Sequence, residues 1–87
     1  MKLVVCLECN DVFNLSYESK SCSCGRTTGQ YLDTLHAVYS GERALPLGFA
    51  NNSFREALQN QPDGPGMGKS FEAFVIPHVC GTFVHIP

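Results

Sequence analysis

The chain has 87 residues, a formal net charge of −2 and an apolar content of 44%, which suits one domain or one core with a small appended module. Its charges form no basic cluster and residues 1–29 are neutral, which argues against a nucleic-acid partner, because phosphate binding needs a basic face. No stretch is long and apolar enough for a signal peptide or a membrane span, so we expect no membrane partner and a cytoplasmic, reducing location.

The first predicted element is a β-strand at residues 2–6, because this stretch is apolar and rich in valine. It leads directly into the first cysteine. The turn-forming pair Asn10-Asp11 follows, and residues 12–15 alternate between the two faces of a second predicted strand. Residues 17–20 then return toward the next cysteines, so the segment predicts a β-hairpin between two turns that carry thiols.

Four cysteines beside this hairpin have a spacing that is typical of metal ligands. Two residues separate Cys6 from Cys9, one residue separates Cys22 from Cys24, and twelve residues lie between the pairs. Four thiolates at about 2.3 Å satisfy a tetrahedral zinc ion and leave no coordination position open for a substrate. The pattern therefore predicts a closed, structural Zn2+ site. Iron fits the same all-sulfur geometry. A redox dithiol and disulfides are the weaker alternatives. Complete disulfide pairing would leave the fifth cysteine, Cys80, without a partner.

These cysteines, together with the Gly25 that ends the second turn, resemble the zinc-ribbon (rubredoxin-knuckle) superfamily over the first third of the chain. The second knuckle of that superfamily usually has two residues between its cysteines, whereas this chain has one. We predict Cys24 as the fourth ligand, and its alternatives are His36, His78, Cys80 and His85. The whole sequence also resembles small zinc-ribbon proteins of bacteria and their phages.

The middle of the chain predicts more β-structure. Residues 31–39 alternate between two faces and predict one long strand. The sequence Ser40-Gly41-Glu42 then predicts a hairpin turn to a partner strand at residues 44–49. Because Pro46 cannot donate a backbone hydrogen bond, we expect this partner strand at a sheet edge or with a bend at the proline.

One helix is predicted after this strand. Ser53 and Glu56 have the spacing of a capping box at the start of a short helix, which ends by Gln61, just before a proline. The glycine-rich residues 62–70 predict an exposed loop. This loop does not match a phosphate-binding loop, because Asp63 occupies the position of the required first glycine.

The last strand is predicted at residues 71–77, and residues 80–87 form an apolar tail. An apolar tail must pack on its own sheet or on another chain, so it is a candidate surface for a homo-oligomer. His78, Cys80 and His85 are close in sequence, but their spacing matches no strong metal-binding pattern, so we expect no second metal site.

Together these patterns predict a small α+β fold. We expect an N-terminal zinc-bound β-ribbon at residues 1–29 to pack, as one compact unit, against a module at residues 30–87 with a short antiparallel sheet and one helix. No catalytic dyad or cofactor motif is evident, so the sequence predicts a non-enzymatic protein-interaction module with an unidentified protein partner. The resemblance to phage proteins implies an inhibitor or adaptor of a host complex. The alternatives are a nucleic-acid-binding zinc ribbon of transcription or translation and a small thiol or redox enzyme.

Overall fold

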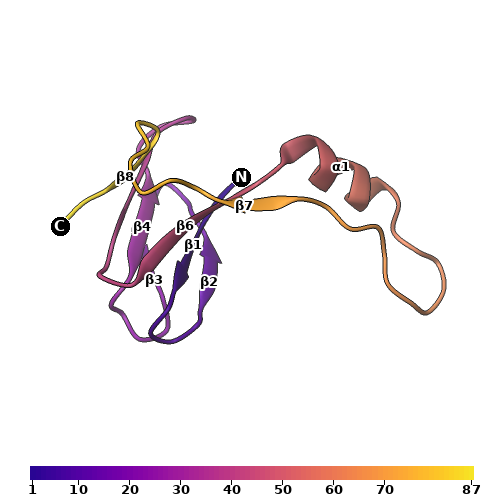
Figure 1. Ribbon diagram of the computed structural model, residues 1–87, viewed down its shortest axis with the longest axis horizontal. Coiled ribbons are helices and arrows are strands. Elements are labelled where there is room, and N and C mark those ends of the chain that lie inside the picture. Colours follow the sequence, from indigo (N-terminus) through magenta and orange to yellow (C-terminus); the bar gives the residue numbers. More distant parts are fainter.

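A computed structural model describes residues 1–87 and contains eight short strands and one helix (Figure 1). In chain order they are β1 (Lys2–Cys6), β2 (Val12–Asn14), β3 (Lys20–Ser21), β4 (Thr28–Tyr31), β5 (Ala37–Ser40), β6 (Ala44–Phe49), α1 (Asn51–Gln59), β7 (Ala73–Val75) and β8 (Phe83–His85). One four-stranded sheet has the order β2-β1-β6-β7, and the other has the order β3-β4-β5-β8. All neighbours are antiparallel except β5 and β8, which are parallel. The small α+β class is confirmed.

The molecule divides into two regions of different shape. We call residues 1–49 and 73–87, which hold both sheets, the body, and residues 50–72, which hold α1 and the glycine-rich loop, the arm. Figure 1 shows the arm extending away from the body, and the overall extents are 45 × 26 × 23 Å. The backbone N–H of Ala50 donates to the carbonyl oxygen of Glu72 at 2.9 Å, so the two ends of the arm are joined at its base.

The hydrophobic core lies between the two sheets of the body. The rings of Tyr39 and Phe83 meet edge to face with their centroids 5.0 Å apart, and neither side chain exposes more than 1% of its surface. The remaining buried members of this cluster are Val4, Leu15, Ala37 and Ile76. Phe83 belongs to the apolar tail, so this part of the tail packs on its own sheet, whereas Val84 and Ile86 of the tail remain 43% and 39% exposed.

Strands from both parts of the chain share each sheet. β1 pairs with β6 along its whole length, and β4 pairs with β5 from Thr28 to Tyr31. The N-terminal residues therefore form the sheets jointly with the later strands. The single helix has nine residues, and it is too short and too polar to cross a bilayer.

The prediction of one long strand at residues 31–39 is wrong, because the chain turns back within this range. β4 ends at Tyr31 and pairs with β5 as a hairpin. The carboxylate of Asp33 accepts backbone N–H groups from Leu35 at 2.8 Å and from His36 at 2.7 Å, an arrangement that stabilises a tight turn. The His36 N–H, the Leu35 N–H and the His36 ring together lower the pKa of Asp33 to about 2.

The prediction that residues 40–42 join two paired strands is also wrong. A turn does follow β5, but β5 and β6 belong to different sheets, so the chain crosses from one layer to the other there. β6 lies between β1 and β7, so the expected edge position for Pro46 is wrong as well. The carbonyl of Pro46 accepts the N–H of Ile76 at 2.9 Å, just beyond the end of β7. The missing proline N–H therefore falls where pairing with β7 stops.

The helix begins earlier than the capping box predicts. α1 starts at Asn51, and Ala50 precedes it without a side-chain hydrogen bond. The Ser53 hydroxyl instead donates to the carbonyl of Ala50 and accepts the N–H of Glu72, while Glu56 pairs with Lys69. The two predicted capping residues therefore connect the helix to the returning end of the arm.

Candidate metal centre

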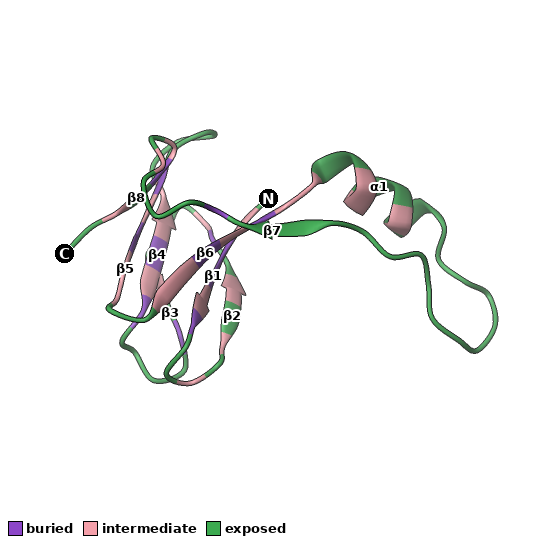
Figure 2. Cartoon of the chain, viewed as in Figure 1, coloured by how far each residue is buried: buried purple, intermediate pink, exposed green.

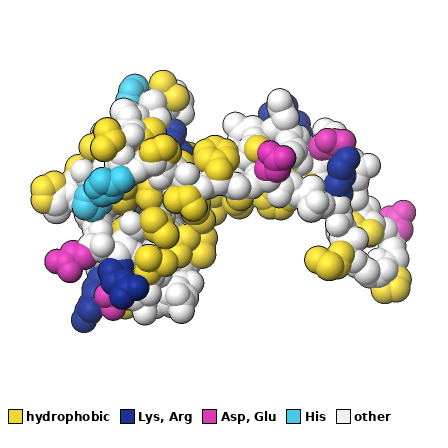
Figure 3. Space-filling model, viewed as in Figure 1, with side chains coloured by type: hydrophobic (Ala, Val, Ile, Leu, Met, Phe, Trp, Pro, Cys, Tyr) yellow, Lys and Arg dark blue, Asp and Glu magenta, His cyan; other side chains and the backbone are white.

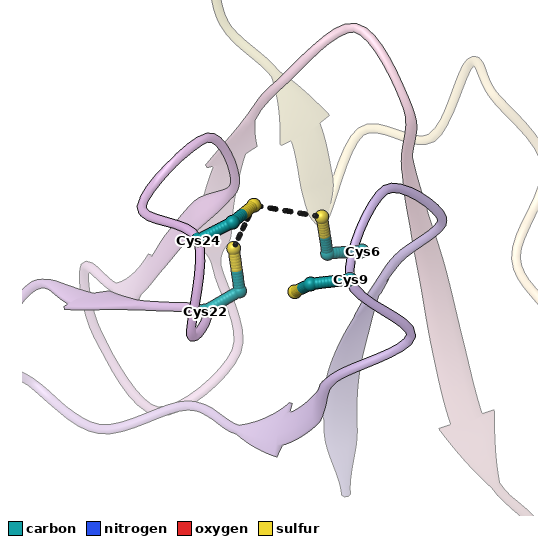
Figure 4. Close-up of side chains that lie close together, drawn as sticks. All are labelled: Cys6, Cys9, Cys22 and Cys24. Atoms are coloured by element: carbon teal, nitrogen blue, oxygen red, sulfur yellow. Dashed lines mark hydrogen bonds between the residues drawn. The ribbon is translucent and has the colours of Figure 1, made fainter.

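The four sulfur atoms of Cys6, Cys9, Cys22 and Cys24 converge on one point between two turns (Figure 4). All four Sγ atoms lie within 4.8 Å of one another. The Cys24 Sγ is 3.4 Å from that of Cys22 and 3.7 Å from that of Cys6. Cys6 and Cys22 are buried, Cys9 is half-buried and Cys24 is exposed, so each turn contributes one buried and one more accessible sulfur.

These distances can be compared with the size of a metal site. Four sulfurs at about 2.3 Å from a tetrahedral ion lie about 3.8 Å from each other. The sulfur–sulfur distances of 3.4 and 3.7 Å around Cys24 are close to this value. The cluster could therefore hold one metal ion with small side-chain adjustments.

The first turn is shaped by backbone hydrogen bonds around Cys6. The carbonyl of Cys6 accepts the N–H of Asn10 at 2.7 Å, and the N–H of Cys6 donates to the carbonyl of Asp11 at 2.9 Å. Asn10 has a φ of 60°, in the left-handed region where asparagine is better tolerated than most residues. The N–H of Leu7 donates to the carbonyl of Arg43 at 2.9 Å, which fastens this turn to the start of β6.

The second turn is one residue tighter and also depends on a left-handed residue. The N–H of Gly25 donates to the carbonyl of Cys22 at 3.1 Å, and Gly25 has a φ of 78°. The backbone of Thr27 accepts the N–H of Cys22 at 3.0 Å and donates its own N–H to the Cys22 sulfur at 3.4 Å. Because a sulfur that accepts an N–H bond is easier to hold as a thiolate, Thr27 supports this ligand from behind.

A side chain of the first turn holds the second turn in place. The Asp11 carboxylate oxygen Oδ2 accepts the backbone N–H of Ser23 at 2.9 Å and the Ser23 hydroxyl at 3.1 Å. Ser23 lies between the two cysteines of the second turn. This link therefore fixes the distance between the two thiol pairs without requiring an ion.

The crossover between the two sheets packs against the same turn. Gly41 has a φ of 131°, and a Cβ atom there would lie 2.9 Å from both the Arg26 carbonyl oxygen and the Thr27 hydroxyl. Only glycine fits such a position without displacing the second turn. The chain between β5 and β6 thus packs closely against Arg26 and Thr27 of the second turn.

The thiols influence one another electrostatically. The Thr27 hydroxyl lowers the pKa of Cys6. Burial opposes ionisation of Cys22, but the Thr27 N–H and the other thiols outweigh it and lower the pKa of Cys22 to about 6. The Arg26 N–H favours the thiolate of Cys24, yet the neighbouring Cys22 sulfur, burial and the Cys6 sulfur raise the pKa of Cys24 to about 12. Neighbouring thiolates repel each other, and a divalent cation between the sulfurs would neutralise this repulsion.

The other residues considered as a fourth ligand lie outside this cluster. His36 is exposed on the β4–β5 turn, where its ring nitrogen Nδ1 contacts Asp33 at 3.0 Å. The Nε2 of His85 donates to the Gly41 carbonyl at 3.1 Å, and the His85 ring lies beside that of His78, with centroids 5.4 Å apart. Cys80 is half-buried against the hydrophobic core. The structure gathers only the four cysteines into a group that could hold an ion.

Two contributors to the site were missed by sequence reasoning. Thr27 supports two of the ligands, and Asp11 joins the two turns through Ser23. The sequence offers a weak signal for Asp11, a short acidic residue directly after the first thiol turn, which we assigned only to turn formation. For Thr27 there is no such signal, because its role depends on how the chain folds back after Gly25.

Comparison of the chain with protein-family models, with curated proteins and with solved structures found no match.

Proposed function

We propose that the chain binds one structural Zn2+ ion through Cys6, Cys9, Cys22 and Cys24 and acts as a non-enzymatic protein-interaction module. When bound, the ion would cross-link the two turns and stabilise the body. Cysteine thiolates suit zinc in a tetrahedral site, and a set of four sulfurs fills every position of that site. The chemistry of the donors therefore favours a structural ion over one that activates water.

The observation that carries the interaction role is the arm. None of its residues is fully buried, and within the helix only Ser53, Phe54 and Ala57 are half-buried (Figure 2). Leu58 and Met67 on the arm are 63% and 98% exposed. Ordering a segment costs about 1–2 kcal/mol per residue, and this arm offsets little of that cost by burial. A partner surface that covers the arm would supply the missing burial.

A nucleic-acid partner has less support. The two arginines nearest the thiol cluster both lie beside the Glu8 carboxylate, Arg26 at 3.6 Å and Arg43 at 4.0 Å. A chain of net charge −2 with its nearby arginines partly neutralised offers little attraction to phosphate. The more specific role of a phage-type inhibitor or adaptor rests on the sequence resemblance alone.

The metal part of the proposal is tested by native mass spectrometry together with elemental analysis of the purified chain. We expect one zinc ion per chain and its loss on treatment with a strong chelator. A protein purified from zinc-containing medium that carries no metal would contradict this part.

The interaction part is tested with the immobilised, metal-loaded chain. We expect it to retain a stoichiometric protein from cell extract, and we expect Leu58→Glu on the arm to abolish that retention. Leu35→Glu is the matched control, because Leu35 is similarly exposed, at 55%, on the β4–β5 turn of the body. Retention of nothing, equal loss with both variants, or retention of nucleic acid that falls steeply with salt would contradict the proposal.

A further inference from the structure

The edge strand β7 differs from the other three sheet edges. The edge strands β2, β3 and β8 all contain polar side chains that form hydrogen bonds or carry charge, among them Asn14, Lys20 and His85. β7 consists of Ala73, Phe74 and Val75, and all of these residues are exposed. Proteins usually protect open edges with charge, proline or covering segments. β7 is short, at three residues, but has no charge, proline or covering segment within the strand.

The backbone direction along β7 can be read from its two flanking hydrogen bonds. The Glu72 carbonyl accepts the N–H of Ala50, and the N–H of Ile76 donates to the Pro46 carbonyl, both at 2.9 Å. Even-numbered residues of β7 therefore face β6. Because backbone groups alternate in direction along a strand, the N–H and C=O groups of Ala73 and Val75 point to the open side of the sheet.

We propose that β7 is a homodimer interface, at which the open edge pairs antiparallel with β7 of a second copy of this chain around a twofold axis at Phe74. In this register Ala73 faces the partner's Val75, and each such pair exchanges both of its outward backbone hydrogen bonds. The two sheets then join into one continuous sheet with the polar β2 strands at its ends. This interface goes beyond the proposed interaction role and does not depend on it.

Self-complementarity favours a second copy as the occupant. Phe74 faces the partner's Phe74 at a non-hydrogen-bonded position, where Cα atoms are about 4.5 Å apart, while its ring lies over Gly48 of β6 in its own sheet. Glu72 faces the partner's Ile76, so the register opposes no like charges. The side chains of Phe74 and Val75 are 52% and 60% exposed in the single chain. Figure 3 shows hydrophobic side chains along the strip that joins the body to the arm, where β7 lies.

The interface is tested by sedimentation of the metal-loaded chain over a range of concentrations. We expect a reversible change from the mass of one chain to the mass of two. Val75→Pro removes only an outward N–H and keeps the bonds to β6, so we expect it to raise the dimer dissociation constant about tenfold or more. Phe74→Lys places like charges opposite each other and should weaken dimerisation at least as much. Val12→Lys on β2 is its control, because Val12 is 50% exposed on the other edge of the same sheet.

The register is tested by cross-linking in a Cys80→Ser background. The pair distance of about 4.5 Å lies within the range for a disulfide, so F74C should form covalent dimers under mild oxidation, whereas V12C should not. The mass of a single chain at every concentration would overturn the proposal. So would equal cross-linking of F74C and V12C, growth into larger aggregates, or binding of β7 to a different protein in place of a second copy.

Discussion

The body and the arm use different means to hold their shape. The body has two sheets, a core between them and a group of four thiols suited to one ion. The arm has one helix, an ion pair between Glu56 and Lys69, and a small aromatic contact at its base. In that contact the ring centroids of Phe54 and Phe71 are 4.9 Å apart, and each is 5.0 Å from the ring centroid of Phe49 in the body.

This difference shows how a short chain can distribute its stability. The four clustered thiols and the buried side chains are all in the body, while no residue of the arm is fully buried. A region that buries little opens more readily than a core, and such regions commonly serve in binding. If the two regions are independent, a mutation in one should leave the stability of the other unchanged.

The largest effect is expected from loss of a metal ligand. Cys9→Ser removes one of the four sulfurs, and a structural zinc site contributes about 10–16 kcal/mol of apparent binding free energy, as much as the whole stability of a typical small domain. We expect the body to unfold, as followed by circular dichroism and thermal melting. Cys80→Ser is the control and should keep both the metal and the transition. If Cys9→Ser melted at the same temperature as the wild type, a structural role of the ion would be contradicted.

Truncation of a core side chain should lower the stability of the body strongly, but by less than loss of the metal. Phe83 has no exposed surface, and Phe83→Ala should lower the free energy of unfolding by about 3–5 kcal/mol through lost burial and the cavity left behind. Chemical denaturation of the metal-loaded protein measures this value. A change below about 1 kcal/mol would mean that the tail does not complete the core in the way the structure shows.

The effect of truncating a side chain in the arm should remain confined to the arm. Phe54→Ala removes the ring that touches both Phe49 and Phe71. We expect amide hydrogen exchange of α1 to become fast, while the free energy of unfolding of the body changes by less than about 0.5 kcal/mol, as for other sites outside a core. If the exchange rates of β1 and β5 rose together with those of α1, the two regions would form one cooperative unit.

One substitution in the core should instead give a small gain in stability. The buried hydroxyl of Tyr39 has no hydrogen-bond partner, so Tyr39→Phe should raise the free energy of unfolding by about 1 kcal/mol. Burial and the nearby Cys80 charge raise the pKa of Tyr39. The wild type should therefore lose stability as the pH rises above about 10, the value for an unfolded tyrosine. The variant should lack this part of the loss. Tyr17→Phe, at an exposed position, is the control, and equal behaviour of the two variants would contradict the expectation.

Local patterns were sufficient to predict several elements. The strands at residues 2–6 and 44–49, the exposed glycine-rich loop and the presence of one short helix follow from residue types that are close in sequence. The structure also brings together the sulfurs of all four predicted ligands. Binding of zinc, and the absence of enzymatic activity, remain predictions.

The errors arose at one local turn and at two positions where distant contacts decide the outcome. The turn at Asp33 separates β4 from β5, but the residues on both sides of it alternate between the two faces of a strand. Periodicity alone therefore predicted one continuous strand. Pro46 occupies an inner strand because β7 ends beside it. Ser53 bonds to Glu72 across the base of the arm instead of capping its own helix. The contacts of Pro46 and Ser53 join residues that are far apart in sequence, whereas the Asp33 turn is local and was overlooked in favour of the alternating pattern.

The parallel pairing of β8 with β5 bears on how the chain folds during synthesis. The four clustered thiols and the first seven strands are translated before Phe83, which must still cover Ala37 in the core. Ribosomes add about 5–20 residues per second, so a nascent chain spends seconds with its core incomplete. An ion captured by the thiols in that interval would hold the early strands together until the last one arrives.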